Sequence, residues 1–179
     1  MLTGDRIQLR EYKEDYITKA KDYINDPEVC LNINPQTPFP ITLKDEEEWF
    51  ENQRKDDNQR NFAIITKDDK EYIGGCGIND IDWKNSVVKV GIFIGKKEYR
   101  GKGYGTEAMK ILLEFIFNQM NINKVMLEVF SFNKRAIKSY KKNGFVEEGR
   151  LRENIYRNGK YHDEILMGLL RREYEDLDK

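Results

Sequence analysis

The sequence predicts a mixed α/β fold with about seven strands and about four helices. In the first half of the chain, three strand-like runs follow one another, which is typical of an antiparallel meander. In the second half, strand-like runs alternate with segments of helical periodicity. This order predicts one mixed, mostly antiparallel sheet with helices packed against it. Because the chain has 179 residues, we expect a single domain spanning residues 1–179.

The chain opens with one predicted strand and one predicted helix. Residues 6–10 alternate between apolar and polar side chains, as a half-buried strand does. Residues 14–25 have helical spacing, and the Asp26-Pro27 pair should end that helix, because the residue before a proline disfavours helical backbone. Residues 32–40 contain three prolines and predict an irregular loop.

A second helix should begin at Thr42 and run to about Arg54. Threonine is a favoured N-cap, and Asp45 lies three residues later, where an acidic side chain completes a capping box. Further on, Asn158-Gly159 is a strong signal for a two-residue hairpin turn between the two closing strands. The elements between them are predicted strands at 61–66, 72–78, 86–95 and 124–130, a helix that follows the glycines of 101–105, and a helix at 134–144 ended by Gly144.

Composition excludes several classes of function. Lys and Arg total 31 and Asp and Glu 32, so the net charge of −1 gives no global attraction to nucleic acid or to an anionic membrane. With His162 as the only histidine, the sequence contains no metal-ligand pattern, and we expect no metal. Cys30 and Cys76 form no motif, and the N-terminal segment is too polar for a signal peptide, so we expect a cytoplasmic protein.

Three glycines at alternate positions, Gly101, Gly103 and Gly105, precede a strongly apolar helix. Glycines allow close approach of the backbone to a ligand, and a helix N-terminus offers free N–H donors and partial positive charge. Arg100 and Lys102 add charge nearby, so the segment predicts a cradle for a phosphate or pyrophosphate. The spacing matches neither a Walker loop nor a dinucleotide fingerprint. A tight structural corner remains the alternative interpretation.

The loop and one motif further along the chain can be compared with known protein families. The pattern R-x-x-G-x-G at Arg100, Gly103 and Gly105 resembles the acetyl-CoA pyrophosphate loop of the GNAT superfamily of N-acetyltransferases. Downstream, residues 127–170 resemble that superfamily's N-x-x-A-x-x-x-Y-x-x-x-G-F segment, and especially the RimJ/RimL-like branch that acetylates protein N-termini and other primary amines. The resemblance covers essentially the whole chain. It implies the GNAT fold, with acetyl-CoA as cosubstrate and the sheet split between strands 86–95 and 124–130.

The resemblance also implies a set of residues that bind the cofactor. Its pantetheine arm can pair with the backbone of the "GIFIG" strand as an added strand would. The asparagine and the alanine of the second motif, here Asn133 and Ala136, are implied to lie along the same arm. Asn133 is also a favoured helix cap without any cofactor. The implied set is Phe93, Ile94, Arg100, Gly101, Lys102, Gly103, Tyr104, Gly105, Thr106, Asn133 and Ala136.

Tyr140 and Glu128 are the candidate catalytic residues. The family resemblance places Tyr140 near the thioester sulfur as general acid; the alternative is simple amphipathic packing. Glu128 lies between Met and Phe on one face of its strand and is the candidate base, although it can also attract a cation, act through a water or be an ordinary surface residue. An acetylated Cys76 and a proton shuttle at His162 are weaker alternatives.

The acceptor implied by the resemblance is a primary amine. A protein N-terminus ranks first, followed by a polyamine such as spermidine and then by an amino sugar or aminoglycoside. Roughly one α-amine in ten is free base at neutral pH, against fewer than about one lysine-like amine in a thousand, so an α-amine needs less deprotonation. A non-catalytic acyl-CoA-binding module and a nucleotide-phosphate binder remain alternatives. The sequence leaves a homodimer open.

Overall fold

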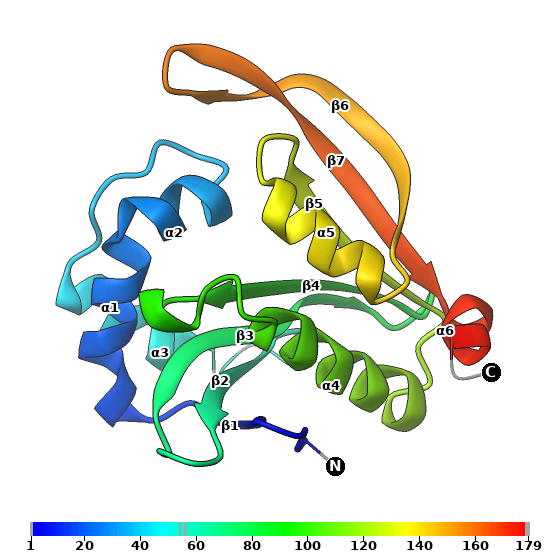
Figure 1. Cartoon of the computed structure of the whole chain (residues 1–179), viewed down its shortest axis with the longest axis horizontal. Coiled ribbons are helices and arrows are strands. Elements are labelled where there is room, and N and C mark those ends of the chain that lie inside the picture. The colour runs from blue at the N-terminus through cyan, green and yellow to red at the C-terminus, as the bar shows by residue number, and fades with distance from the viewer. Residues whose placement is uncertain (1, 54, 56, 178–179) are drawn as a thin grey trace.

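A seven-stranded sheet in the order β1-β2-β3-β4-β5-β7-β6 forms the centre of the protein (Figure 1). The structure, a computed structural model, describes residues 2–53, 55 and 57–177. Neighbouring strands are antiparallel except β4 and β5, which run parallel, so the predicted mixed, mostly antiparallel sheet is confirmed. The strands are β1 (Ile7–Glu11), β2 (Arg60–Thr66), β3 (Tyr72–Asp82), β4 (Val87–Ile94), β5 (Lys124–Phe130), β6 (Val146–Arg157) and β7 (Lys160–Leu170).

The described residues contain six α-helices, two more than the sequence predicted. The prediction missed α2 because Pro27, expected only to end the preceding helix, also begins the next one. Asp26 caps that helix by accepting a hydrogen bond from the Glu28 N–H at 2.9 Å, and proline is favoured in the first helical turn. The helices are α1 (Ile17–Asn25), α2 (Pro27–Ile33), α3 (Leu43–Asn52), α4 (Tyr104–Gln119), α5 (Lys134–Lys142) and α6 (Arg171–Leu177).

The predicted capping box at the start of α3 is confirmed. The Thr42 hydroxyl accepts a hydrogen bond from the Asp45 N–H at 3.2 Å, and the Asp45 carboxylate accepts one from the Thr42 N–H at 2.6 Å. The helix ends at Asn52, and its expected end at Arg54 lies outside the described residues. None of the described helices has the length and apolar character that crossing a membrane requires.

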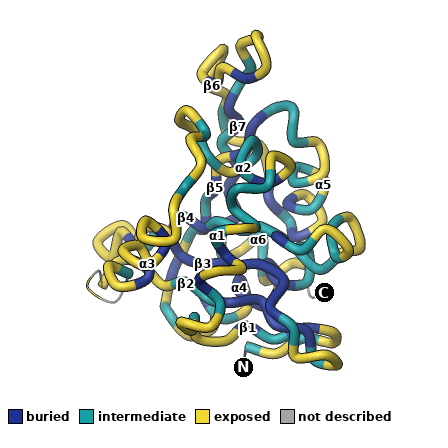
Figure 2. The backbone as a smooth tube through the Cα atoms, turned by 90° about the vertical axis from the view of Figure 1, so that its left-hand side faces the viewer, coloured by how far each residue is buried: buried dark blue, intermediate teal, exposed yellow. Residues whose placement is uncertain are grey.

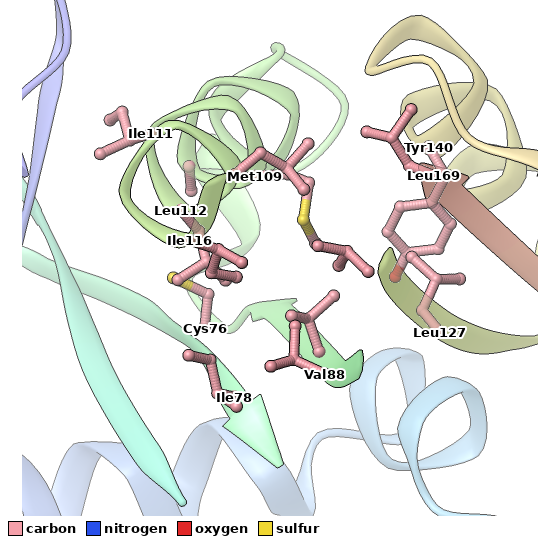
Figure 3. Close-up of a cluster of buried hydrophobic side chains, with 14 of the residues drawn as sticks. Cys76, Ile78, Val88, Met109, Ile111, Leu112, Ile116, Leu127, Tyr140 and Leu169 are labelled. Atoms are coloured by element: carbon pink, nitrogen blue, oxygen red, sulfur yellow. The ribbon is translucent and has the colours of Figure 1, made fainter. Parts of the chain in front are cut away.

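The main hydrophobic core lies between α4 and one face of the sheet. Figure 3 shows Met109 and Leu112 of α4 among side chains from the strands, such as Val88 of β4 and Leu127 of β5. Figure 2 shows the same pattern along the backbone, where the central strands are buried and the loops are exposed. The apolar stripe of α4 thus covers the sheet on the side where the helix begins at the glycine loop.

The sheet is split between β4 and β5. The two strands pair only at Val87 with Lys124, at Val88 with Val125, and at Lys89 with Met126. Past Lys89 they separate, although β4 continues to Ile94. The predicted split is therefore confirmed, and it leaves the second half of β4 with an open edge toward β5.

The β6–β7 hairpin reaches beyond the body of the protein (Figure 1). Its turn has positive φ angles of 50° at Asn158 and 78° at Gly159, the backbone that the predicted two-residue turn requires. The buried guanidinium of Arg157 donates hydrogen bonds to the carbonyls of residues in and after α2: Gln36 at 2.9 Å, Leu31 at 3.5 Å, and Asn34. The hairpin is thereby tied to the proline-rich loop.

Candidate active site

The split between β4 and β5 contains a cleft of about 270 Å³, which we call the acyl cleft. Its walls come from α2, β4, the glycine loop, β5 and α5. Two of the predicted site residues, Lys102 and Tyr104, do not line it. Those that do are Phe93, Ile94, Arg100, Gly101, Gly103, Gly105, Thr106, Glu128, Asn133, Ala136 and Tyr140.

The glycine loop has the backbone that only glycine adopts easily. Gly101 and Gly103 have φ angles of 73° and 87°, and Gly103 is the N-cap of α4. The next three N–H groups, those of Tyr104, Gly105 and Thr106, donate no backbone hydrogen bond to a described residue. Free donors of this kind, at the positive end of a 16-residue helix, favour an anion.

Arg6 supports the loop from the start of β1. It donates one hydrogen bond to the carbonyl of Lys102 at 3.0 Å and another to the carboxylate of Glu107 in the first turn of α4 at 2.8 Å. Its guanidinium also lies 4.2 Å from the centre of the Tyr104 ring. Burial raises the pKa of Glu107, but the hydrogen bonds from Arg6 outweigh it and hold that pKa below its ordinary value. This contact joins residues that are far apart in the chain, so local sequence patterns do not predict it.

Arg100 lines the cleft, but its guanidinium does not face it as a free charge. Only 4% of the side chain is exposed, and it pairs with Asp26 at 2.7 Å and Glu28 at 2.9 Å. It also donates to the backbone carbonyls of Ile94, at 3.1 Å, and Gly95. The sequence-based expectation that Arg100 adds positive charge to the anion cradle therefore differs from the structure, where two carboxylates balance that charge. The backbone carbonyl of Ile94, a predicted partner of the pantetheine arm, also already accepts a hydrogen bond from Arg100.

The unpaired cations of the cleft come from α5 instead. Arg135, Lys138 and Lys142 line it, and no hydrogen bond or ion pair joins them to a described residue. Their spacing of three and four residues places them on one face of the helix. The stretch "KRAIKSYKK" carries this signal in the sequence, where basic residues recur at helical spacing. At its start, Asn133 acts as the expected cap, accepting from the Ala136 N–H at 3.1 Å.

Tyr140 projects from α5 into the inner end of the cleft. It is 7% exposed, and its ring packs edge-on against Phe145 at 5.9 Å. Figure 3 shows the ring beside Leu127 of β5. Burial raises the pKa of the Tyr140 hydroxyl to about 12, so the group stays protonated throughout the neutral range. A protonated hydroxyl at this place can serve as a proton donor.

Glu128 faces away from the main core, as its place in the strand predicted. Val125, Leu127 and Val129 of the same strand are buried in the core with α4. The Glu128 carboxylate lies 2.8 Å from the ammonium of Lys89, the last β4 residue paired with β5. This ion pair therefore spans the point where the split begins. It was not anticipated, because the two residues belong to strands that are far apart in the chain.

Comparison with known proteins decides between the classes of function left open by the geometry. Residues 6–146 match the acetyltransferase (GNAT) domain family. The chain belongs to the GNAT family. It is accordingly an acetyl-CoA-dependent N-acetyltransferase, and its seven-stranded split sheet is the GNAT fold.

Three proteins illustrate the range of its GNAT relatives. The SPbeta prophage-derived uncharacterized N-acetyltransferase YokL of Bacillus subtilis (strain 168) is 33% identical over 97% of this chain and 94% of that protein. The putative ribosomal N-acetyltransferase YdaF of Bacillus subtilis (strain 168) is 32% identical over 60% of this chain and 58% of that protein. The crystal structure of spermidine N-acetyltransferase from Vibrio cholerae, in complex with CoA and spermine, superimposes with a TM-score of 0.87 at 25% identity, covering 96% of this chain and 99% of that chain.

The two weaker catalytic alternatives find little support in this GNAT structure. Cys76 is fully packed in the core, and burial raises the pKa of its thiol, so the reactive thiolate is disfavoured. The His162 ring packs edge-on against Phe132 at 4.8 Å, and the residue does not line the acyl cleft. Next to it, the Asp163 carboxylate accepts a hydrogen bond from Arg150 at 3.1 Å, which is a structural contact within the hairpin.

Proposed function

We propose that this GNAT enzyme acetylates the α-amine of a protein N-terminus, as the RimJ/RimL-like branch does. The observation that carries the proposal is the acyl cleft itself, in which a proton donor, Tyr140, and a carboxylate, Glu128, line a split that continues to the glycine loop. The similarity to the putative ribosomal acetyltransferase supports the choice of acceptor. We also propose that transfer occurs by direct attack while both substrates are bound.

Two sets of donors suit the phosphates of acetyl-CoA. The N–H groups of residues 104–106 offer the end of a helix, and the three cations of α5 offer charge that no described carboxylate neutralises. The open edge of β4 around Phe93 is positioned to pair with the amides of the pantetheine arm. When bound, acetyl-CoA supplies an activated thioester carbonyl, and a backbone N–H of β4 is the candidate donor to its oxygen.

Tyr140 and Glu128 divide the proton transfers between them. As the amine nitrogen forms its bond to the carbonyl carbon and the carbon–sulfur bond breaks, Tyr140 donates its proton to the departing sulfur. Glu128 accepts the proton that the amine loses, directly or through a water, from the opposite face of β5. No covalent enzyme intermediate is required, so most of the acceleration comes from holding the two reactants together.

A polyamine is the second candidate acceptor, and one observation favours it: the similarity to the spermidine enzyme of Vibrio cholerae extends over nearly the whole chain. A carboxylate near the thioester also suits a cationic substrate. Amino sugars and a non-catalytic acyl-CoA-binding role rank below these two.

The test is release of free thiol from acetyl-CoA across an amine panel: N-terminal peptides, spermidine, amino sugars and aminoglycosides. We expect the highest kcat/KM with a peptide, and acetylation at its α-amine by mass spectrometry. Glu128→Gln should lower activity mainly below the pKa of the amine, while Glu114→Gln, which changes a glutamate of α4 outside the cleft, serves as control. Binding of acetyl-CoA without thiol release from any amine would instead indicate a non-catalytic module.

We also propose a cytoplasmic location. Cys30 and Cys76 are both free thiols in the structure, as proteins in reducing compartments keep them. Cell fractionation with an antibody to the protein measures the location directly. A homodimer stays a prediction, which light scattering of the purified protein tests.

A further inference from the structure

A second cavity of about 200 Å³, which we call the aromatic pocket, lies beside the acyl cleft. Four rings contribute to its walls, those of Tyr12, Trp49, Phe62 and Phe93. Asn61 and Asn79 supply the polar groups. Every described side chain that lines the pocket is uncharged. Neither asparagine side chain donates or accepts a hydrogen bond with a described residue, so both amides are available to a ligand.

The aromatic pocket and the acyl cleft share a wall. Ile33, Ile92 and Phe93 line both cavities. Because side chains alternate along a strand, Phe93 lies on the same face of β4 as Lys89, whose ammonium contacts Glu128. The pocket is thus next to the carboxylate that is proposed to receive the proton of the amine.

Glycines form the floor of the aromatic pocket and fix its polar groups. A Cβ atom at Gly91 would lie 2.8 Å from the Asn79 amide nitrogen, and one at Gly77 would lie 2.6 Å from the Asn61 amide oxygen. Any larger residue at these two positions would displace an asparagine side chain. The pocket therefore depends on the absence of side chains at its floor.

Among the described residues, neither cavity has an unpaired carboxylate that could bind a polycation. Glu28 and Glu128 are the two described carboxylates that line the acyl cleft. Glu28 already pairs with Arg100 at 2.9 Å and Lys97 at 3.3 Å, and Glu128 pairs with Lys89. A second ammonium group on the acceptor would lose its hydration here and gain no unpaired anion in return.

We infer that the aromatic pocket binds the first side chain of the acceptor, and that this side chain is aromatic or large and apolar. The amine would lie at Glu128, and Asn61 and Asn79 would pair with the first peptide groups, which have the same donors and acceptors as their amides. This inference rests on the proposed acetyltransferase function. It assigns the acceptor as a peptide N-terminus of that composition and excludes spermidine as the preferred substrate.

A set of peptides that differ only in the first residue tests the inference through kcat/KM. The first residue is Phe, Leu, Ser, Lys or Asp, and spermidine is included at equal concentration. We expect the Phe and Leu peptides to exceed the others and spermidine by about tenfold or more, as pocket complementarity for an apolar group typically gives. A higher kcat/KM for spermidine, or for the Lys or Asp peptide, overturns the inference while leaving the acetyltransferase function intact. No thiol release from any amine overturns the proposed function itself.

The two tryptophans of the chain provide a readout that does not depend on turnover. Trp49 lines the aromatic pocket, whereas Trp83 is 57% exposed in the turn between β3 and β4 and lines neither cavity. In Trp83→Phe, the only tryptophan left is Trp49. With CoA present, titration with the Phe peptide should change the fluorescence of Trp49 until the signal saturates. Spermidine at the same concentrations should leave the Trp49 fluorescence unchanged.

The reverse variant, Trp49→Phe, is the matched control. It retains Trp83, whose fluorescence should not respond to the peptide, and its KM for the Phe peptide should rise while its affinity for CoA stays the same. A saturating response of Trp49 to spermidine, or an unchanged KM in Trp49→Phe, contradicts the assignment of the pocket.

Discussion

The acyl cleft and the aromatic pocket share a wall but are built in different ways. The part of the cleft that we propose for the phosphates of acetyl-CoA comes from two short segments, residues 99–106 and 133–142, and offers backbone N–H groups and cations. The aromatic pocket draws its lining from six places along the chain, between Tyr12 and Phe93, and contains no charged group among the described residues. A cosubstrate shared by a family can be recognised by a local motif, whereas an individual acceptor is recognised by what the fold brings together.

Loss of the Tyr140 hydroxyl should have the largest effect on turnover. Tyr140→Phe is expected to lower kcat by about 100-fold or more, as removal of a general acid typically does, with little change in acetyl-CoA affinity. Tyr99→Phe is a matched control, because Tyr99 lines the same cleft but its hydroxyl already donates to Glu71 at 3.2 Å. Equal losses in the two variants would contradict an acid role. Since the pKa of Tyr140 is about 12, the parent should show no loss of this acid as the pH rises from 7 to 10.

Removal of the α5 cations should weaken the binding of acetyl-CoA in the acyl cleft without affecting the binding of an acceptor in the aromatic pocket. The double variant Arg135→Ala/Lys138→Ala should reduce acetyl-CoA affinity by at least about tenfold, because charged hydrogen bonds to phosphate contribute more than neutral ones. Calorimetry at two salt concentrations should show a smaller salt dependence than in the parent. Lys134→Ala/Lys141→Ala removes equal charge from the same helix outside the cleft and should bind acetyl-CoA as the parent does.

A branched residue in the glycine loop should weaken cofactor binding more modestly. Gly101 and Gly159 have similar φ angles of 73° and 78°, and a Cβ at either position meets no other atom within 4 Å. Valine should therefore strain both positions by about 1–2 kcal/mol. Gly101→Val should lose up to about tenfold in acetyl-CoA affinity, and Gly159→Val should retain it. If both variants bind alike, the loop does not form the cradle.

The last prediction concerns stability at α3, the helix that supplies Trp49 to the aromatic pocket, and not catalysis or binding. Glu46 is 3% exposed, no described donor reaches its Oε1, and burial raises its pKa from 4.5 to about 7. The unfolded chain ionises near pH 4.5, so the free energy of unfolding should fall as the pH rises from 4.5 through 7, by up to about 3 kcal/mol.

Denaturant titrations at pH 5 and pH 8 measure this loss. Glu46→Gln should remove the pH dependence, whereas Glu47→Gln, which changes an exposed neighbour, should keep it. The same slope in the parent and in Glu46→Gln would show that another group causes it.

The sequence predicted the parts of this protein that depend on local chemistry. Thr42 and Asp45 signalled a helix start and Asn158-Gly159 a turn, because each rule involves only neighbouring residues. A proline likewise marked the end of α1, but its second role in starting α2 was missed.

What the sequence did not predict are the contacts between distant segments. Arg100 looked like a ligand for an anion, yet Asp26, the N-cap of α2, and Glu28 in that helix neutralise it. The pairing of Lys89 with Glu128 depends on two strands joined by a helix, and the role of Arg6 depends on β1 lying beside α4. The aromatic pocket belongs to this second class, because its lining comes from segments far apart in the chain.

The hydrogen bonds of Arg157 join two segments that lie far apart in the chain. Its guanidinium donates hydrogen bonds to the carbonyls of Leu31, Asn34 and Gln36, so the β6–β7 hairpin and the proline-rich loop form one continuous bridge. We expect such a bridge to hinder a surface loop of a folded partner more than a free chain end. Under the proposed function, the enzyme should therefore act best on nascent or unfolded N-terminal tails.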